Sequence, residues 1–396
     1  MKRPLLVLAF LPLAAGSLGA QAVPEGSQAA RVEPAYRRTP SFRVDPFRHA
    51  MIPHWGFVFS AGATGENNTL NLADARAAIY LADNDSLLAG DVLDILGLIP
   101  EGEGLKGSAL GEGGFYLGGP FGSHLSLGLS AQGRAYGGFQ LDDDFVALVR
   151  DGNGARQEFS LGNTKGAALA TAEGGAHVVL RFGPLGTEDG VNLNLGFGAR
   201  YIKPIAFARM QSTVANGGRI LISGDSVAAN IGVELANTPE PLDSTLKNGK
   251  ASIAGDFLVR LTWPTSGFAL EAMVANVGNV TVHMVETERK SFNVATTNFQ
   301  EFADSLDSFD STSVKDTVDL KVKLPRIIRF TASAWANRFL QIDVSTTLPV
   351  HGDFESPLSV DVGTTWRLIR TMGQSLGGLF RNATGGGARV ELGTFF

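Results

Sequence analysis

One short motif in the sequence could carry catalysis. The stretch GQSLG at positions 373–377 matches G-x-S-x-G, in which a serine nucleophile stands on a sharp turn between a strand and a helix. The adjacent glycines Gly377 and Gly378 disfavour the helix that this turn requires, and no alternation of strands and helices precedes it. We therefore expect a loop between the last two strands, and the sequence predicts a protein that is not an enzyme.

Metal and cofactor chemistry finds no support in the residue patterns. The zinc motif H-E-x-x-H, the phosphate-binding P-loop and the EF-hand loop are all absent from the sequence. Asp83 and Asp85 could ligate Ca²⁺, but capping of a helix explains them more simply. We predict no cofactor and no metal, and the net charge of -6 argues against nucleic acid as a partner.

Charged residues recur instead on one face of several predicted strands. If the apolar faces of these strands contact lipid, the charged faces point into a lumen. The candidate lumen-lining residues are Arg134, Arg181, Arg200, Arg260, Arg329, Arg367, Arg389, Asp256, Asp343, Asp361 and Glu391. Two interpretations stay open: the arginines attract anionic solutes or a carboxylate head group, or the opposite charges pair with one another and brace the interior.

The strands themselves are predicted from apolar residues at every second position. Apolar and polar side chains alternate over segments of roughly ten residues, which is typical of strands with two different faces. The clearest segments are 125–136, 191–201, 256–263, 340–348, 360–368 and 388–396. Counting the weaker candidates, we expect about fourteen strands, since single-chain bacterial barrels use even numbers.

A soluble β-sandwich would show the same alternation, so other features must decide. Tyr201, Trp263, Trp366 and Phe396 stand at the ends of apolar faces, where a membrane barrel carries its aromatic girdles. The chain has 49 Gly, no Cys, and no apolar window long enough for a helical span after its first residues. We therefore predict an all-β fold: a transmembrane antiparallel β-barrel in contact with outer-membrane lipid.

The N-terminus predicts export across the inner membrane. Lys2 and Arg3 precede an apolar run from Leu5 to Leu13, and small residues follow up to Ala22. This is the layout of a cleavable signal peptide, with cleavage expected after Ala22. We expect three parts: the signal peptide (1–22), a segment rich in proline and arginine (23–54) and the barrel (55–396). The second part is either a plug in the barrel or a periplasmic leader.

Three stretches interrupt the strand pattern. Residues 83–97 and 142–150 each begin with aspartates and continue with apolar residues, which predicts capped amphipathic helices. Residues 298–310 are a third candidate. Short helices of this kind suit extracellular loops or a plug.

The layout as a whole resembles the superfamily of outer-membrane long-chain fatty-acid transporters, including its PorV-like and TraF-like branches. The likeness rests on the signal peptide, a basic N-terminal segment, a helix after the second strand and an end at Phe396. Residues 198–206 look like that group's strand running into an extracellular loop, and residues 324–330 look like its Leu-Pro element before a late strand. The resemblance implies a hatch inside the barrel and a side opening for hydrophobic cargo. Separately, an alternating last strand that ends in Phe396 resembles the assembly signal of bacterial outer-membrane barrels, which implies the barrel assembly machinery as a partner. The chain lacks the Asn-Pro-Ala that opens the hatch in these transporters.

Three functions remain open at this point. The first is passive transport of hydrophobic or amphipathic small molecules across the outer membrane of a Gram-negative cell. The second, which the PorV-like branch implies, is a structural or protein-export partner with a filled lumen. The third is a porin that prefers anions.

Overall fold

The computed structural model contains a single antiparallel β-sheet with little helix. It describes residues 45–47, 50–51, 55–69, 96–151, 158–185, 190–213, 218–223, 226–238, 250–263, 265–296, 311–336, 340–348, 354, 358–369, 372–379 and 385–395. Within these ranges the sheet has 17 strands. No helix in them is long and apolar enough to cross a membrane.

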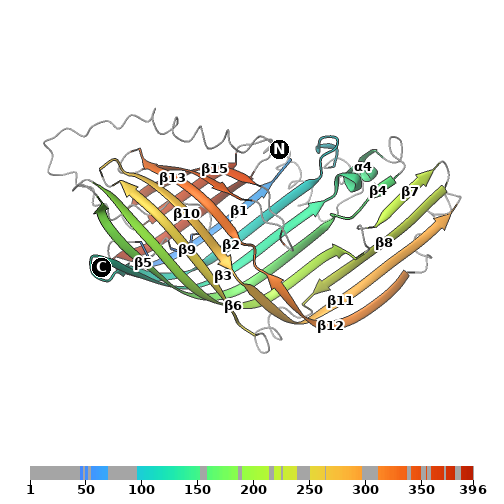
Figure 1. Ribbon diagram of the computed structural model, residues 1–396, viewed down its shortest axis with the longest axis horizontal. Helices are drawn as coiled ribbons and strands as arrows, with labels where there is room; N and C mark the ends of the chain where they lie inside the picture. The colour runs from blue at the N-terminus through green and yellow to red at the C-terminus, as the bar shows by residue number, and fades with distance from the viewer. Residues whose placement is uncertain are drawn as a thin grey trace.

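Twelve of the described strands close into a ring, which is a β-barrel (Figure 1). Each strand pairs with the next, and the last strand pairs again with the first, where Phe59 lies opposite Leu392. In order around the barrel these are β1 (Gly56–Asn67), β2 (Leu105–Pro120), β3 (Leu125–Leu141), β5 (Lys165–Leu185), β6 (Val191–Ser212), β9 (Ser252–Trp263), β10 (Phe268–Val277), β13 (Ile327–Trp335), β14 (Leu340–Thr347), β15 (Ser359–Ile369), β16 (Met372–Leu379) and β17 (Gly385–Phe395). Closure leaves no exposed edge in the ring.

The remaining strands extend the sheet beyond one end of the ring, on one side only (Figure 1). We call this part the extension. Its strands are β4 (Glu158–Ser160), β7 (Arg219–Ser223), β8 (Ser226–Asn237), β11 (Asn279–Thr296) and β12 (Ser311–Lys323). Only Gly278 separates β10 from β11, and residues 324–326 separate β12 from β13. The upper end of β6 pairs with β8, which pairs in turn with β11. The extension therefore continues the barrel wall beyond the ring.

The two ends of the ring differ in the length of their connections. At one end the strands are joined by the short segments 121–124, 186–190, 264–267, 336–339 and 370–371. At the other end lie long connections such as 68–104 and 142–164, together with the extension. Outer-membrane barrels have short periplasmic turns and longer extracellular loops. We accordingly name the two ends periplasmic and extracellular.

The polarity of the barrel is the reverse of that of a soluble protein. Arg134 and Gln132 on β3 are buried, while Leu129 on the opposite face of the same strand is 54% exposed. On β9, Asp256 is fully buried and Phe257 is 47% exposed. Charged side chains inside and large apolar side chains outside cannot be stable in water, but they suit a wall that faces lipid. The predicted faces of 125–136 and 256–263 are confirmed.

Some expectations are met and others need correction. The helix predicted at 142–150 is confirmed as α4 (Asp143–Asp151), whose first turn carries Asp143 and Asp144. The segment 198–206 does not run into a loop, because β6 continues to Ser212 and Pro204 sits at a bulge. Positions 373–377 form part of strand β16 rather than a loop, because Gly373–Gly378 pairs with both neighbouring strands. Residues 83–95, 298–310 and Phe396 lie outside the described residues.

The lipid-facing wall makes a stability prediction. Phe257 lies at mid-height on the outer face and packs edge-on against Phe197, with ring centroids 6.2 Å apart. Replacing Phe257 with arginine should lower the free energy of unfolding by about 2–4 kcal/mol, because a cation at mid-depth in lipid is poorly solvated. The measurement is a guanidinium titration of protein in lipid vesicles. Phe257→Leu serves as the control and should retain most of the stability; an arginine variant as stable as that control would argue against lipid contact.

Candidate functional site

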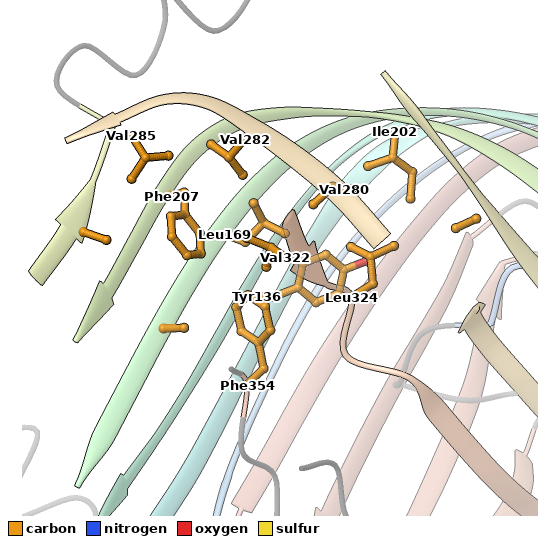
Figure 2. Packing of buried hydrophobic residues seen from close by; sticks show 13 residues of the cluster. Tyr136, Leu169, Ile202, Phe207, Val280, Val282, Val285, Val322, Leu324 and Phe354 are labelled. Atoms are coloured by element: carbon orange, nitrogen blue, oxygen red, sulfur yellow. The ribbon is translucent and has the colours of Figure 1, made fainter. Parts of the chain in front are cut away.

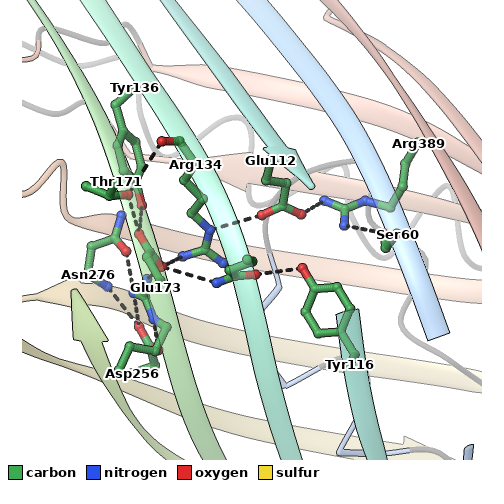
Figure 3. Close-up of polar contacts among 12 residues, drawn as sticks. Ser60, Glu112, Tyr116, Arg134, Tyr136, Thr171, Glu173, Asp256, Asn276 and Arg389 are labelled. Carbon is green, nitrogen blue, oxygen red and sulfur yellow. Dashed lines mark hydrogen bonds and ion pairs between the residues drawn. The ribbon is translucent and has the colours of Figure 1, made fainter. Parts of the chain in front are cut away.

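The barrel interior is divided into layers, and a continuous set of ion pairs occupies the middle one (Figure 3). Arg389 on β17 forms an ion pair with Glu112 on β2. Glu112 also accepts a hydrogen bond from Arg134 Nε on β3 at 3.1 Å. Arg134 Nη1 reaches Glu173 Oε2 on β5, again at 3.1 Å. We call this set, together with Arg200 and Asp256 below, the charge layer.

Arg200 on β6 continues the charge layer. Its Nη1 donates to Glu173 Oε2 at 2.6 Å, and its Nε and Nη2 donate to the two oxygens of Asp256 on β9 at 2.6 and 2.8 Å. All three side chains are fully buried. Neutral groups complete the layer: Tyr116 donates to Gln132, and Tyr136 donates to Glu173. The charge layer thus joins strands from both sides of the seam between β17 and β1.

Asn276 ties the charge layer to an irregular point in the wall. The residue has a left-handed backbone (φ 62°) at a bulge in the pairing of β10 with β9. Its backbone N–H donates to Asp256 Oδ1 at 3.0 Å, and its side chain accepts from Arg200. Its Nδ2 donates to the carbonyl of Pro325 at 2.9 Å. Asparagine is one of the few non-glycine residues that adopt this left-handed conformation readily, and Asp256 and Arg200 hold Asn276 in it through these hydrogen bonds.

Below the charge layer, toward the periplasm, the N-terminal segment contacts the inner wall. Phe47 is fully buried in a cluster with Val179, Leu258, Met273 and Ala275, which we call the socket. Its ring stands edge-on to His177 at a centroid distance of 5.3 Å.

The socket depends on glycines. A Cβ on Gly196 would lie 2.8 Å from the Phe47 ring, and one on Gly128 would lie 2.9 Å from Ala50. The wall is therefore shaped to admit this part of the chain.

Above the charge layer, toward the extracellular end, the interior is apolar (Figure 2). We call this cluster the apolar layer. It consists of Tyr136, Ala167, Leu169, Ile202, Phe207, Ala236, Ala254, Val280, Val282, Val285, Val322, Leu324 and Phe354. The side chains come from β3, β5, β6, β8, β9, β11 and β12 and from the connections around Leu324 and Phe354. The charge layer and the apolar layer thus lie at different heights within one barrel.

The wall changes partners beside the apolar layer. The lower part of β6 pairs with β9 as far as Ile202, and its upper part pairs with β8 from Ala208 onward. At the change, Thr238 donates its backbone N–H to the Phe207 carbonyl at 2.9 Å. On β11, whose Val282 and Val285 belong to the same apolar layer as Phe207, the pairing with β12 shifts register between these two valines. Met284, which lies between them, has a left-handed backbone (φ 54°). We call this irregular band the wall interruption.

The structure brings together only part of the predicted lumen set. Arg134, Arg200, Arg389 and Asp256 lie in the charge layer. Arg329 lies 3.7 Å from Glu271, and Arg260 contacts Met51 Sδ at 3.7 Å near the socket. The acidic residues Asp343, Asp361 and Glu391 are buried on the inner faces of β14, β15 and β17. Arg181 is half-buried near the periplasmic end of β5, and the side chain of Arg367 lies outside the described residues.

Several residues of the interior were missed by the sequence prediction. Glu112 and Glu173, which with His177 belong to these missed residues, are flanked by small outer residues: Gly111 and Gly113, and Ala172 and Gly174. This weakens the contrast between the two faces, although the spacing of Glu173 and His177 still puts both on one face. Phe47 gave no signal, because nothing in 45–51 distinguishes it from other loops. Among the described residues no cluster of His, Asp or Glu could hold a metal ion.

A closed antiparallel ring, lipid-compatible outer faces and a charged interior define an integral β-barrel of the bacterial outer membrane. No protein-family profile matches the chain, and no curated protein is similar in sequence.

Solved structures similar to it include the toluene transporter TodX of Pseudomonas putida, with 8% identity, 90% of this chain and 94% of that chain covered, and TM-score 0.33. The toluene transporter TbuX of Ralstonia pickettii has 8% identity, 88% and 92% coverage and TM-score 0.34. The translocator domain of the autotransporter NalP of Neisseria meningitidis has 8% identity, 86% and 88% coverage and TM-score 0.34.

The charge layer predicts that replacing a buried arginine lowers the free energy of unfolding much more than replacing an exposed one. Arg200→Met leaves Glu173 and Asp256 buried with fewer partners, which should lower the free energy of unfolding by about 3–5 kcal/mol. Arg289→Met is the matched control: its side chain is 66% exposed, and its partner Glu234 keeps Arg209 at 2.7 Å. That variant should lose less than about 1 kcal/mol. Denaturant titration of both variants in lipid vesicles measures the difference, and similar losses would contradict the account.

Proposed function

We propose that this barrel is a passive transporter of hydrophobic or amphipathic small molecules. The observation that supports this most directly is that the apolar layer lies against the wall interruption, at Ile202, Phe207, Val282 and Val285. Cargo entering from the extracellular end meets apolar side chains and, beside them, the least regular part of the wall. It leaves sideways into the bilayer once these side chains separate.

The charge layer supports the sideways route. Hydrophobic cargo that continued toward the periplasm would have to separate Arg200 from Glu173 and Asp256. Separating buried ion pairs in contact with an apolar molecule is costly, since neither charge regains water. The route through the wall meets the apolar layer and the hydrogen bonds between Phe207 and Thr238 but separates no buried ion pair, and is therefore the easier one.

The N-terminal segment acts as a plug in this proposal. Its contacts with the socket at Phe47 and Ala50 favour this role over a free periplasmic leader. The plug and the charge layer together close the barrel to water and ions. This arrangement matches the hatch and side opening that the resemblance to the long-chain fatty-acid transporter superfamily implies.

The two alternatives receive different support. The charge layer does not support an anion-preferring porin, because its three arginines are paired with three carboxylates and so carry no excess positive charge. The arginines are Arg134, Arg200 and Arg389, and the carboxylates belong to Glu112, Glu173 and Asp256. A structural or export partner, which the PorV-like branch implies, remains the second candidate, since the same pairs fill and brace the interior. Such a protein would carry no solute.

Uptake of an uncharged amphiphile tests the transport proposal. A radiolabelled long-chain alcohol is added outside proteoliposomes that carry lipopolysaccharide in the outer leaflet, and its rate of entry is compared with that into vesicles without the protein. Val282→Thr keeps the side-chain shape but adds a hydroxyl to the apolar layer. If this buried hydroxyl raises the free-energy barrier for passage of the alcohol by roughly 1 kcal/mol, entry should be about fivefold slower than with the unchanged protein.

The matched control is Val314→Thr, at a residue of the extension that is 60% exposed. It should leave the rate unchanged. Equal rates with and without the protein would favour the structural alternative, and steady anion-selective conductance would favour the porin.

We also propose that the chain reaches the outer membrane after cleavage near Ala22 and that Phe396 engages the barrel assembly machinery. Mass spectrometry of protein purified from outer membranes should find Val23 at the N-terminus. A chain that retains Met1 would contradict cleavage. Deletion of Phe396 should reduce the amount of assembled barrel without changing the cleaved N-terminus.

A further inference from the structure

We infer that Asp256 couples the plug to the wall interruption through His177 and Asn276. This rests on the proposed function for its purpose, because it says that the plug's position controls whether the wall can open. The coupling itself can be measured without any transport.

The first link joins the plug to His177. Phe47 packs edge-on against the His177 ring, and both are buried. The ring is held in a slot between two glycines: a Cβ on Gly175 would lie 3.0 Å from its Cε1, and one on Gly198 would overlap it. The two glycines and Phe47 together orient the ring, so a displacement of Phe47 removes one of the surfaces that hold it.

The second link joins His177 to Asp256. His177 Nε2 lies 3.4 Å from Asp256 Oδ2, the same oxygen that accepts the 2.6 Å hydrogen bond from Arg200 Nε. His177 and Arg200 thus share one carboxylate oxygen in a fully buried site. A turn of the His177 ring changes how that oxygen is held, and the Asp256–Arg200 pair must adjust.

The third link joins Asp256 to the wall. Asp256 Oδ1 accepts the Asn276 N–H, and Asn276 holds the Pro325 carbonyl through its amide at 2.9 Å. Asn276 is the left-handed residue at the bulge directly below β11, and Pro325 stands between β12 and β13. Asn276 therefore links Asp256 to two places in the wall: the bulge that precedes β11 and the connection between β12 and β13. Loss of these hydrogen bonds lets the backbone at the bulge move, because the Asn276 N–H and side chain are then no longer fixed.

Other groups around this path are already engaged in the charge layer. From β5, Glu173 is bonded to Arg134 and Arg200. Among the described residues, His177 is the member of the path that contacts both the plug and an acidic partner. It acts as a positioning residue that transmits the state of the plug.

The test uses a spin label at Met284→Cys in the wall interruption, where the native side chain is 51% exposed. The chain has no native cysteine, so the label is unique. Phe47→Ala loosens the plug and should shorten the rotational correlation time of this label in the lipid-reconstituted full chain. A label at Val314→Cys in the extension is the control and should not respond to Phe47→Ala.

The decisive step repeats Phe47→Ala in a His177→Phe background. Phenylalanine fills the slot between the glycines and keeps the ring contact, but it cannot bond to Asp256. We expect the response of the Met284→Cys label to Phe47→Ala to be lost. The same response in both backgrounds, or no response in either, would overturn the coupling.

Should His177→Phe fail to fold, Asp256→Asn provides a second background, since it keeps an acceptor for the Asn276 N–H but removes the charge. The same loss of response is expected there. A working coupling together with no amphiphile uptake would reject the transport function alone, whereas uptake without coupling would reject only this inference.

Discussion

Pairing of buried charges is the constraint on which this structure depends. A lipid-facing wall has to be apolar outside, and period-two strands then place their polar residues inside a closed ring. A guanidinium or carboxylate in that interior is stable only with a partner close by. The line of contacts from Arg389 through Glu112, Arg134, Glu173 and Arg200 to Asp256 meets this requirement across strands far apart in the sequence.

The charge layer also organises what lies above and below it. The apolar layer lies on the extracellular side of the charge layer, and the socket lies on its periplasmic side. The irregular points of the wall cluster just above the charged level, at Asn276, Met284 and the partner change of β6. The charge layer thus lies next to the part of the wall where strand pairing is least regular.

The sequence predicts the fold and the orientation of most strands, because alternation is a local property. Arg200 and Asp256 are assigned to the inner face by spacing alone, and the structure shows them bonded to each other. What cannot be predicted is which charges meet, since partners such as Arg389 and Glu112 are distant in the chain and depend on the register of closure. The long strand through Pro204 was also missed, because a proline normally ends a strand unless a bulge accommodates it.

The position of Arg389 has a consequence for the order of assembly. It stands on β17, which comes last along the chain among the strands of the ring, yet its partners Glu112 and Ser60 belong to β2 and β1, the first strands of the ring. Until the C-terminal strand docks, Glu112 keeps only Arg134 of its two arginines. The ion pair between Arg389 and Glu112 therefore forms only when the ring is closed. This pair stabilises the closed barrel relative to an open sheet.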